Sequence, residues 1–223
     1  MSVLSFVERP PAGGEASGLL ILHHGRGTDE HDLLGLGEAL DPHGRLRLIT
    51  PRAPLRLPGS PGYHWYVVPR VGYPDPRTFH EAYAWLGELH EELWQRTGLG
   101  PERTVLGGFS MGAVMSYALA LGADRPSPAG VMAFSGFIPV VAGWQAHPGD
   151  RTALRVFTAH GREDPVIAVD FARRARAQLT AASLRVDYHE SPGGHEIIPA
   201  HIPLARAWLG ELVGAERRPS GQR

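Results

Sequence analysis

The sequence contains no cysteine, which excludes disulfide bonds, thiolate metal sites and a cysteine nucleophile. It contains no lysine either, so all 22 basic residues are arginine. No run approaches the roughly 18 to 20 apolar residues of a membrane span, and the first residues lack the basic start and apolar stretch of a secretory signal. We therefore expect a soluble, cytoplasmic protein without a membrane span.

The charge balance and hydrophobic content describe an ordinary globular protein. The formal net charge is -1, hydrophobic residues make up 43% of the chain, and charged residues make up 20%. These values exclude a disordered polymer and a strongly nucleic-acid-seeking protein, so a small molecule is the expected partner. A length of 223 residues predicts one domain over residues 1–223, with a flexible tail from about residue 215.

Short apolar runs alternate with longer segments whose apolar residues recur every three or four positions. This pattern is typical of βα units around a mostly parallel sheet, so the predicted class is α/β. The Pro- and Gly-rich stretch 51–76 is long and aromatic, and we interpret it as an ordered excursion over one sheet edge. The predicted strands are 18–23, 45–50, 104–109, 130–135, 154–159 and 184–189, and the predicted helices are 33–40, 76–96, 113–122, 166–182 and 199–213.

The segment GGFSMG at residues 107–112 joins a predicted strand directly to a helix of small residues. A nucleophile elbow needs this context, because a sharp strand-to-helix turn exposes the serine hydroxyl and flanking glycines leave room for nearby backbone. The helix that follows directs its positive N-terminal end towards any oxyanion formed there. Ser110 is therefore the candidate nucleophile. The alternative is an ordinary tight turn in which Ser110 caps the helix.

A serine nucleophile requires a histidine base, and the base in turn requires a carboxylate that holds the imidazole tautomer. His195 is the best placed of the histidines that follow Ser110, because it lies on a Gly-rich loop between the last predicted strand and the last helix. The other four fit strands, turns or caps better: His147, His160, His189 and His201.

The acid is expected on the loop after the preceding strand, because elbow hydrolases order the three residues Ser, acid, His. Asp164 in HGREDPVI meets this condition, and the adjacent Glu163 would point elsewhere. The alternative makes Asp164 the N-cap of the following helix.

An oxyanion hole needs two backbone donors, one from the residue after the nucleophile and one from the loop after an early strand. These are the N–H groups of Met111 and Arg26, the latter between Gly25 and Gly27 in the loop 23–34. The same loop is rich in His, Asp and Glu, which leaves a metal site as an alternative. Its ligands follow no recognised spacing, so we expect no metal and no other cofactor.

Together these motifs resemble the phospholipase/carboxylesterase family of α/β-hydrolases, which includes acyl-protein thioesterases and small bacterial carboxylesterases. The resemblance spans LHHGRGTDEHDLL, RAPLRLPGSPGYHWY, GGFSMGA, HGREDPVI and GGHEI, nearly the whole chain. It implies an α/β-hydrolase fold without a large cap, and a triad of Ser110, Asp164 and His195 that hydrolyses esters or thioesters. Many members have Gln at the position of Met111, and the thioesterases usually have Leu at the position of Arg26.

The aromatic excursion is expected to line the substrate pocket through Trp65 and Tyr63, although ordinary core packing is the alternative for each. Arg26 and Arg70 would favour an acidic substrate. The 18 residues 136–153 between two predicted strands leave little room for a lid, so small soluble esters fit better than emulsified lipid. The expected activity is that of a serine carboxylesterase acting as a monomer or homodimer. The alternatives are an acyl-protein thioesterase or lysophospholipase-type hydrolase, a peptidase or acyltransferase, and a non-catalytic binding protein on the same fold.

Overall fold

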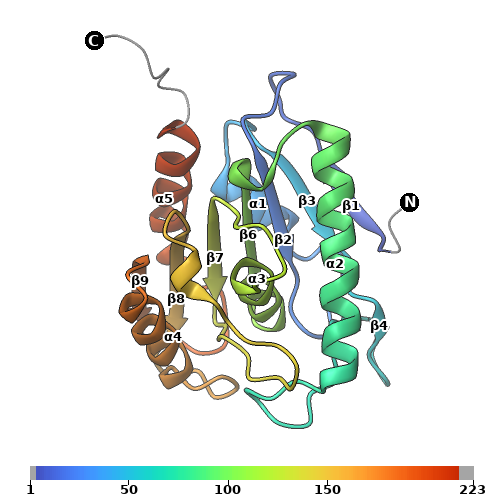
Figure 1. Cartoon of the computed structure of the whole chain (residues 1–223), viewed down its shortest axis with the longest axis vertical. Helices are drawn as coiled ribbons and strands as arrows, with labels where there is room; N and C mark the ends of the chain where they lie inside the picture. The colour runs from blue at the N-terminus through green and yellow to red at the C-terminus, as the bar shows by residue number, and fades with distance from the viewer. Residues whose placement is uncertain (1–3, 216–223) are drawn as a thin grey trace.

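The computed structural model describes residues 4–215, which form a central seven-stranded sheet in the order β1-β3-β2-β6-β7-β8-β9 (Figure 1). β1 pairs antiparallel with β3, whereas every other neighbouring pair in this sheet is parallel. The strands span Phe6–Arg9 (β1), Leu19–His23 (β2), Arg47–Pro51 (β3), Thr104–Phe109 (β6), Gly130–Phe134 (β7), Arg155–Gly161 (β8) and Arg185–Ser191 (β9).

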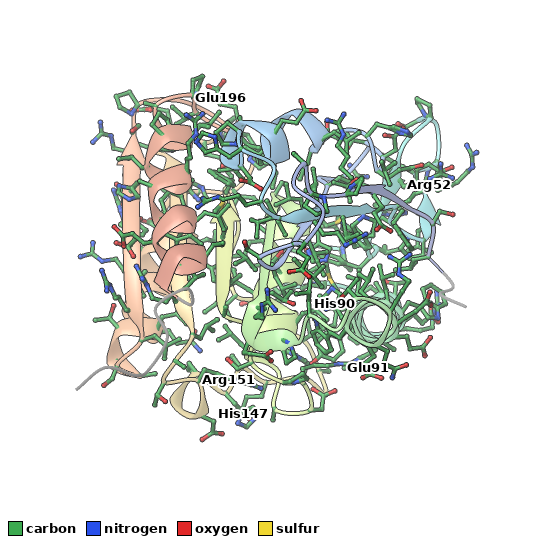
Figure 2. The ribbon with its side chains drawn as sticks, turned by 90° about the horizontal axis from the view of Figure 1, so that it is seen from above. Arg52, His90, Glu91, His147, Arg151 and Glu196 are labelled. Carbon is green, nitrogen blue, oxygen red and sulfur yellow. The ribbon has the colours of Figure 1, made fainter. Side chains whose placement is uncertain are left out.

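Helices cover both faces of the sheet, because the central strands are apolar on both sides. One apolar core lies between the sheet and α2, α3 and α4, and the other lies between the sheet and α1 and α5. Figure 2 shows α2 end-on on one side of the sheet and α5 on the other. The helices span Leu34–Leu40 (α1), Pro76–Thr97 (α2), Met111–Leu121 (α3), Asp170–Ala181 (α4) and His201–Ala215 (α5).

Local sequence explains the two helices that matter most for the site. α2 begins after Asp75, whose carboxylate accepts from the N–H of Thr78 at 2.9 Å, and ends at Gly98 in the left-handed conformation at φ 68°. α3 consists of small and apolar residues that are all buried, and its neighbours are the sheet and α2. This close packing fixes the start of α3 against the end of β6, where the nucleophile elbow was predicted.

The six predicted strands and five predicted helices are present, with shifts at their ends. The largest shift is at α4, which begins at Asp170 rather than at residue 166, because Asp164 caps a separate turn over the intervening residues. The prediction missed the edge strand β1 and a two-stranded hairpin, β4 (Leu55–Arg56) with β5 (Tyr63–His64), inside the excursion 51–76. Beyond residue 215, the predicted tail lies outside the described residues.

The chain adopts the α/β-hydrolase fold, and its described part carries no large cap. Within residues 4–215, no helix combines the length and the apolar character needed to cross a bilayer. The loops that follow β2, β6, β8 and β9 leave the carboxyl ends of parallel strands, at the lower end of the sheet in Figure 1. Ligand sites of open α/β sheets form at this end.

Candidate active site

The elbow between β6 and α3 holds Ser110 at φ 55° and ψ -120°, a conformation that residues other than glycine rarely adopt. Gly108 and Gly112 are required because the loop after β2 lies against them. A Cβ on Gly112 would stand 1.9 Å from the carbonyl oxygen of His23, and one on Gly108 would stand 2.6 Å from the same oxygen. The two glycines therefore let the backbone after β2 approach the nucleophile.

The structure brings together the three side chains that the sequence predicted. His195 Nε2 lies 2.8 Å from the hydroxyl oxygen of Ser110, and His195 Nδ1 lies 2.7 Å from Oδ2 of Asp164. The imidazole also packs on the ring of Phe109, with 5.0 Å between the ring centroids. These contacts join residues from the loops after β6, β8 and β9 into one continuous hydrogen-bonded chain.

Asp164 is held so that one oxygen faces the histidine. Its Oδ1 accepts from the backbone N–H groups of Val166 and Ile167, both at 2.8 Å, and its side chain is fully buried. Burial alone would raise the pKa of Asp164, but the hydrogen bonds from His195, Ile167 and Val166 outweigh it and lower the pKa below its ordinary value. The carboxylate is therefore ionised near neutral pH and keeps the Nδ1 proton on His195.

A second histidine, which directly follows the predicted strand 154–159, also faces this carboxylate. His160 Nε2 lies 2.8 Å from the carbonyl oxygen of Ile167 and 3.3 Å from Oδ2 of Asp164. Its Nδ1 is buried without a hydrogen-bond partner among the described residues, and burial lowers the pKa of the ring. His160 is therefore a neutral imidazole whose Nε2–H donates to the carbonyl of Ile167 and stabilises the acid loop.

Glu163, which was expected only to point elsewhere, ties the acid loop to the histidine loop. Its carboxylate accepts from the N–H of Gly193 at 2.6 Å, and its own N–H donates to the carbonyl oxygen of Gly193 at 3.0 Å. Gly193 has a φ of 141°, which favours glycine. The two adjacent acids therefore have different roles: Asp164 orients the imidazole of His195, and Glu163 holds the loop that carries His195.

The loop after β2 is held by His24, whose contacts define its tautomer. His24 Nε2 accepts from the N–H of Ala53 at 3.0 Å, so Nδ1 carries the proton and donates to the carbonyl oxygen of Gly25 at 2.7 Å. The hydroxyl of Thr28 donates to the same carbonyl at 3.1 Å. Sequence patterning could not separate this structural role of His24 from metal ligation, because the partners lie far away in the chain.

Arg26 and Met111, the predicted oxyanion donors, line the same cavity as Ser110 and His195. Met111 is the first residue of α3, so its N–H has no partner inside the helix. Over residues 4–215, neither this N–H nor that of Arg26 donates to another protein group. Both N–H groups therefore remain available to an oxygen bound beside Ser110.

Trp65 and Tyr63, which were predicted to line the substrate pocket, are not among the residues that line the cavity at Ser110, and both contact the loop after β2. Trp65 is fully buried, and its indole N–H donates to the carbonyl oxygen of His24 at 2.9 Å. The carbonyl oxygen of Tyr63 accepts from the N–H of Gly27 at 2.8 Å. The neighbouring Tyr66 lines the cavity in their place.

Two cavities meet at the imidazole of His195. The first has a volume of about 420 Å³, contains Ser110 and Met111, and is walled by apolar side chains of the loops after β5, β7 and β8. The second has a volume of about 490 Å³ and lies between α1 and the start of α5. Both are lined by Arg26, Phe109 and His195. Both cavities therefore offer space for a small molecule next to His195.

The His, Asp and Glu side chains of the loop 23–34 do not all converge on one point. His23 bonds to the hydroxyl of Ser116 at 2.8 Å, and Glu30 forms an ion pair with Arg52. Among the described residues, the one group whose ligand atoms could meet at a metal ion is Asp29, Glu30 and His31. Because Arg52 already holds the Glu30 carboxylate from two nitrogens, we assign no metal to this group.

Comparison with known proteins identifies the family. The sequence profile of the phospholipase/carboxylesterase family matches residues 6–210. The crystal structure of esterase PE8 is 31% identical, with a TM-score of 0.79 over 94% of this chain and 99% of that one. The Bacillus cereus carboxylesterase structure is 22% identical, with a TM-score of 0.80 over 94% of this chain and 95% of that one. Lysophospholipase-like protein 1 of Mus musculus is 25% identical over 89% of this chain and 88% of its own. The chain therefore belongs to the phospholipase/carboxylesterase family, a family of ester hydrolases.

Proposed function

We propose that the protein is a serine carboxylesterase that hydrolyses small soluble carboxylic esters through an acyl-enzyme intermediate. One observation carries this proposal: the hydrogen-bonded chain from Ser110 through His195 to Asp164, which begins at the wall of an accessible cavity. A serine that only capped α3 would use its hydroxyl to accept from the helix backbone, and Ser110 forms no such bond.

The first half of the reaction forms the acyl-enzyme. His195 Nε2 takes the proton from the Ser110 hydroxyl as its oxygen attacks the ester carbonyl, and Asp164 stabilises the resulting imidazolium. The carbonyl oxygen becomes an oxyanion, which accepts from the N–H groups of Arg26 and Met111. His195 then donates the proton to the alcohol oxygen, and the bond between that oxygen and the acyl carbon breaks.

The second half releases the acid. Water enters from the side that the alcohol has left, His195 takes one of its protons, and the oxygen attacks the acyl carbon. The proton then returns to Ser110 as the acyl group leaves. Because the second cavity contains His195 but neither Ser110 nor Met111, it suits the alcohol and the incoming water, whereas the first cavity suits the acyl group.

Substrate size follows from the walls of the first cavity. A volume of about 420 Å³ accommodates a short acyl chain, and no inserted helix covers the opening among the described residues. Val68, Val166 and Tyr66 supply apolar contact for such a chain. We therefore expect activity on short and medium acyl esters in solution, without activation by a lipid interface.

A chain-length series of aryl esters tests the proposal on wild-type and Ser110→Ala protein. We expect wild-type kcat/KM to rise and then fall with acyl length, and turnover by Ser110→Ala to drop to the background rate. Wild-type turnover by Ser110→Ala would refute the assignment. A matched ester and thioester of one acyl group, assayed together, would separate a carboxylesterase from an acyl-protein thioesterase type. A protein that turns over neither, and does not react with a fluorophosphonate, would be a binding protein.

A further inference from the structure

The acyl cavity, defined here as the one that contains Ser110 and Met111, has an uneven distribution of charge. Arg26 and Arg70 both line it, and none of its lining residues is Asp or Glu. The Asp164 carboxylate, which faces His195, is fully buried and already accepts hydrogen bonds from His195, Val166 and Ile167. The only fixed charges on the wall of the cavity are therefore positive.

These two guanidinium groups lack the carboxylate partners that other arginines of the protein have. Arg52 pairs with Glu30, and Arg173 pairs with Glu190. Over residues 4–215, no carboxylate pairs with Arg26 or Arg70. The Arg70 guanidinium lies over the ring of Tyr73, 3.7 Å from its centroid. Stacking of this kind orients the plane of the guanidinium and leaves its N–H groups free at the edge.

The second cavity differs in charge, because two carboxylate residues, Asp32 and Glu196, line it together with one arginine. Figure 2 shows Glu196 on the side of the sheet that carries α5, away from α2. Arg26 lies between the two cavities and lines both. An anionic group on a bound ester is therefore attracted to the acyl side and repelled from the alcohol side.

We propose that the enzyme prefers esters whose acyl group ends in a carboxylate, that is, monoesters of dicarboxylic acids. This inference rests on the proposed esterase function. Arg70 and Arg26 bind the distal carboxylate through charge-assisted hydrogen bonds. Val71, Phe137 and Ile167 line the same cavity and contact the methylene chain between that carboxylate and the scissile carbonyl. A neutral acyl chain keeps the apolar contacts but loses the ionic ones.

The test uses pH-stat titration to compare monoethyl adipate with neutral ethyl hexanoate, and 4-acetoxybutanoate, whose carboxylate lies on the alcohol side, with butyl acetate. Monoethyl succinate and monoethyl suberate extend the acyl series in both directions. We expect kcat/KM for the best acyl-side carboxylate to exceed that for ethyl hexanoate by about tenfold or more. The kcat/KM for 4-acetoxybutanoate should fall below that for butyl acetate, the neutral ester with the same acyl group and the same number of alcohol carbons. Added salt should reduce the acyl-side preference, because the arginines are exposed.

Arg70→Gln is the decisive variant, since Arg70 is exposed and its main chain has no catalytic task. We expect it to lower the ratio of kcat/KM for the dicarboxylic monoester to that for ethyl hexanoate by about tenfold. Arg185→Gln is the matched control, because Arg185 is also exposed, lies at the start of β9 away from the site, and should leave the ratio unchanged.

The outcomes separate the two proposals. Hydrolysis of ethyl hexanoate with no preference for any acyl-side carboxylate would overturn the inference while the esterase function stands. An unchanged ratio in Arg70→Gln would also overturn it. Absence of ester turnover, together with no reaction of Ser110 with a fluorophosphonate, would overturn both.

Discussion

Two histidines outside the site, His23 at the end of β2 and His90 on α2, make the stability of the fold sensitive to acid. Both are buried, with 5.9 Å between their ring centroids, and the Nε2 atom of each has no hydrogen-bond partner among the described residues. Burial, with a smaller contribution from the positive charge of Arg125, lowers the pKa of His90 to about 3. Burial also lowers the pKa of His23 well below its ordinary value.

The sign and size of the effect follow from proton linkage. Below a pH of about 6.5 the unfolded chain protonates a histidine that the folded protein keeps neutral, so the free energy of unfolding falls as the pH falls. Between pH 7 and pH 5, one histidine with a folded pKa of about 3 lowers the free energy of unfolding of the protein by about 2 kcal/mol. Urea denaturation at these two pH values should therefore show that His90→Gln loses about 2 kcal/mol less than wild type.

The control for this experiment is His43→Gln, because His43 is exposed in the folded protein. We expect His43→Gln to lose as much stability as wild type over the same pH interval. Equal losses in wild type and His90→Gln would refute the reasoning, since they would mean that the buried imidazole takes up its proton without unfolding.

Three further predictions concern the site. Asp164→Asn should fold but turn over esters about four orders of magnitude more slowly, as the equivalent change does in serine proteases, because the wrong imidazole tautomer then faces the serine. A loss of less than tenfold in steady-state kcat would point to another acid. In urea denaturation, Ser110→Gly should have a free energy of unfolding about 1 kcal/mol higher than that of Ser110→Ala, because glycine relieves the strain at φ 55°. The reverse order of the two free energies would contradict the strained elbow. Gly112→Ala should lower the unfolding free energy by more than about 2 kcal/mol, since its Cβ would meet the His23 carbonyl. The control, Gly35→Ala in α1, places its Cβ in open space and should raise the unfolding free energy by up to about 1 kcal/mol.

The sequence predicted the features that depend on local order along the chain. GGFSMG lies between a strand and a helix, and Asp164 and His195 follow later strands in the order that an elbow hydrolase needs. Since all three follow strands of a parallel sheet, the topology alone brings them to one edge. The hydrogen bonds between them agree with that placement.

Features that depend on contacts between distant segments could not be predicted. Trp65 resembles a pocket aromatic in the sequence, yet it packs beneath the loop after β2 because its indole N–H reaches the His24 carbonyl. Glu163 gives no signal beside Asp164, because its partner Gly193 is 30 residues away. The edge strand β1 was missed since its short run is only partly buried and carries charged residues. In each case the missing information is a tertiary contact rather than a pattern.

The central claim is that the Ser110 hydroxyl is made nucleophilic by His195. Its most direct test is reaction of the 223-residue protein with a fluorophosphonate, followed by intact-mass measurement and peptide mapping. We predict one phosphonyl group per chain, located on Ser110, with no adduct in Ser110→Ala and much slower labelling in His195→Ala. An unlabelled wild-type protein, or labelling of His195→Ala at the wild-type rate, would contradict the account.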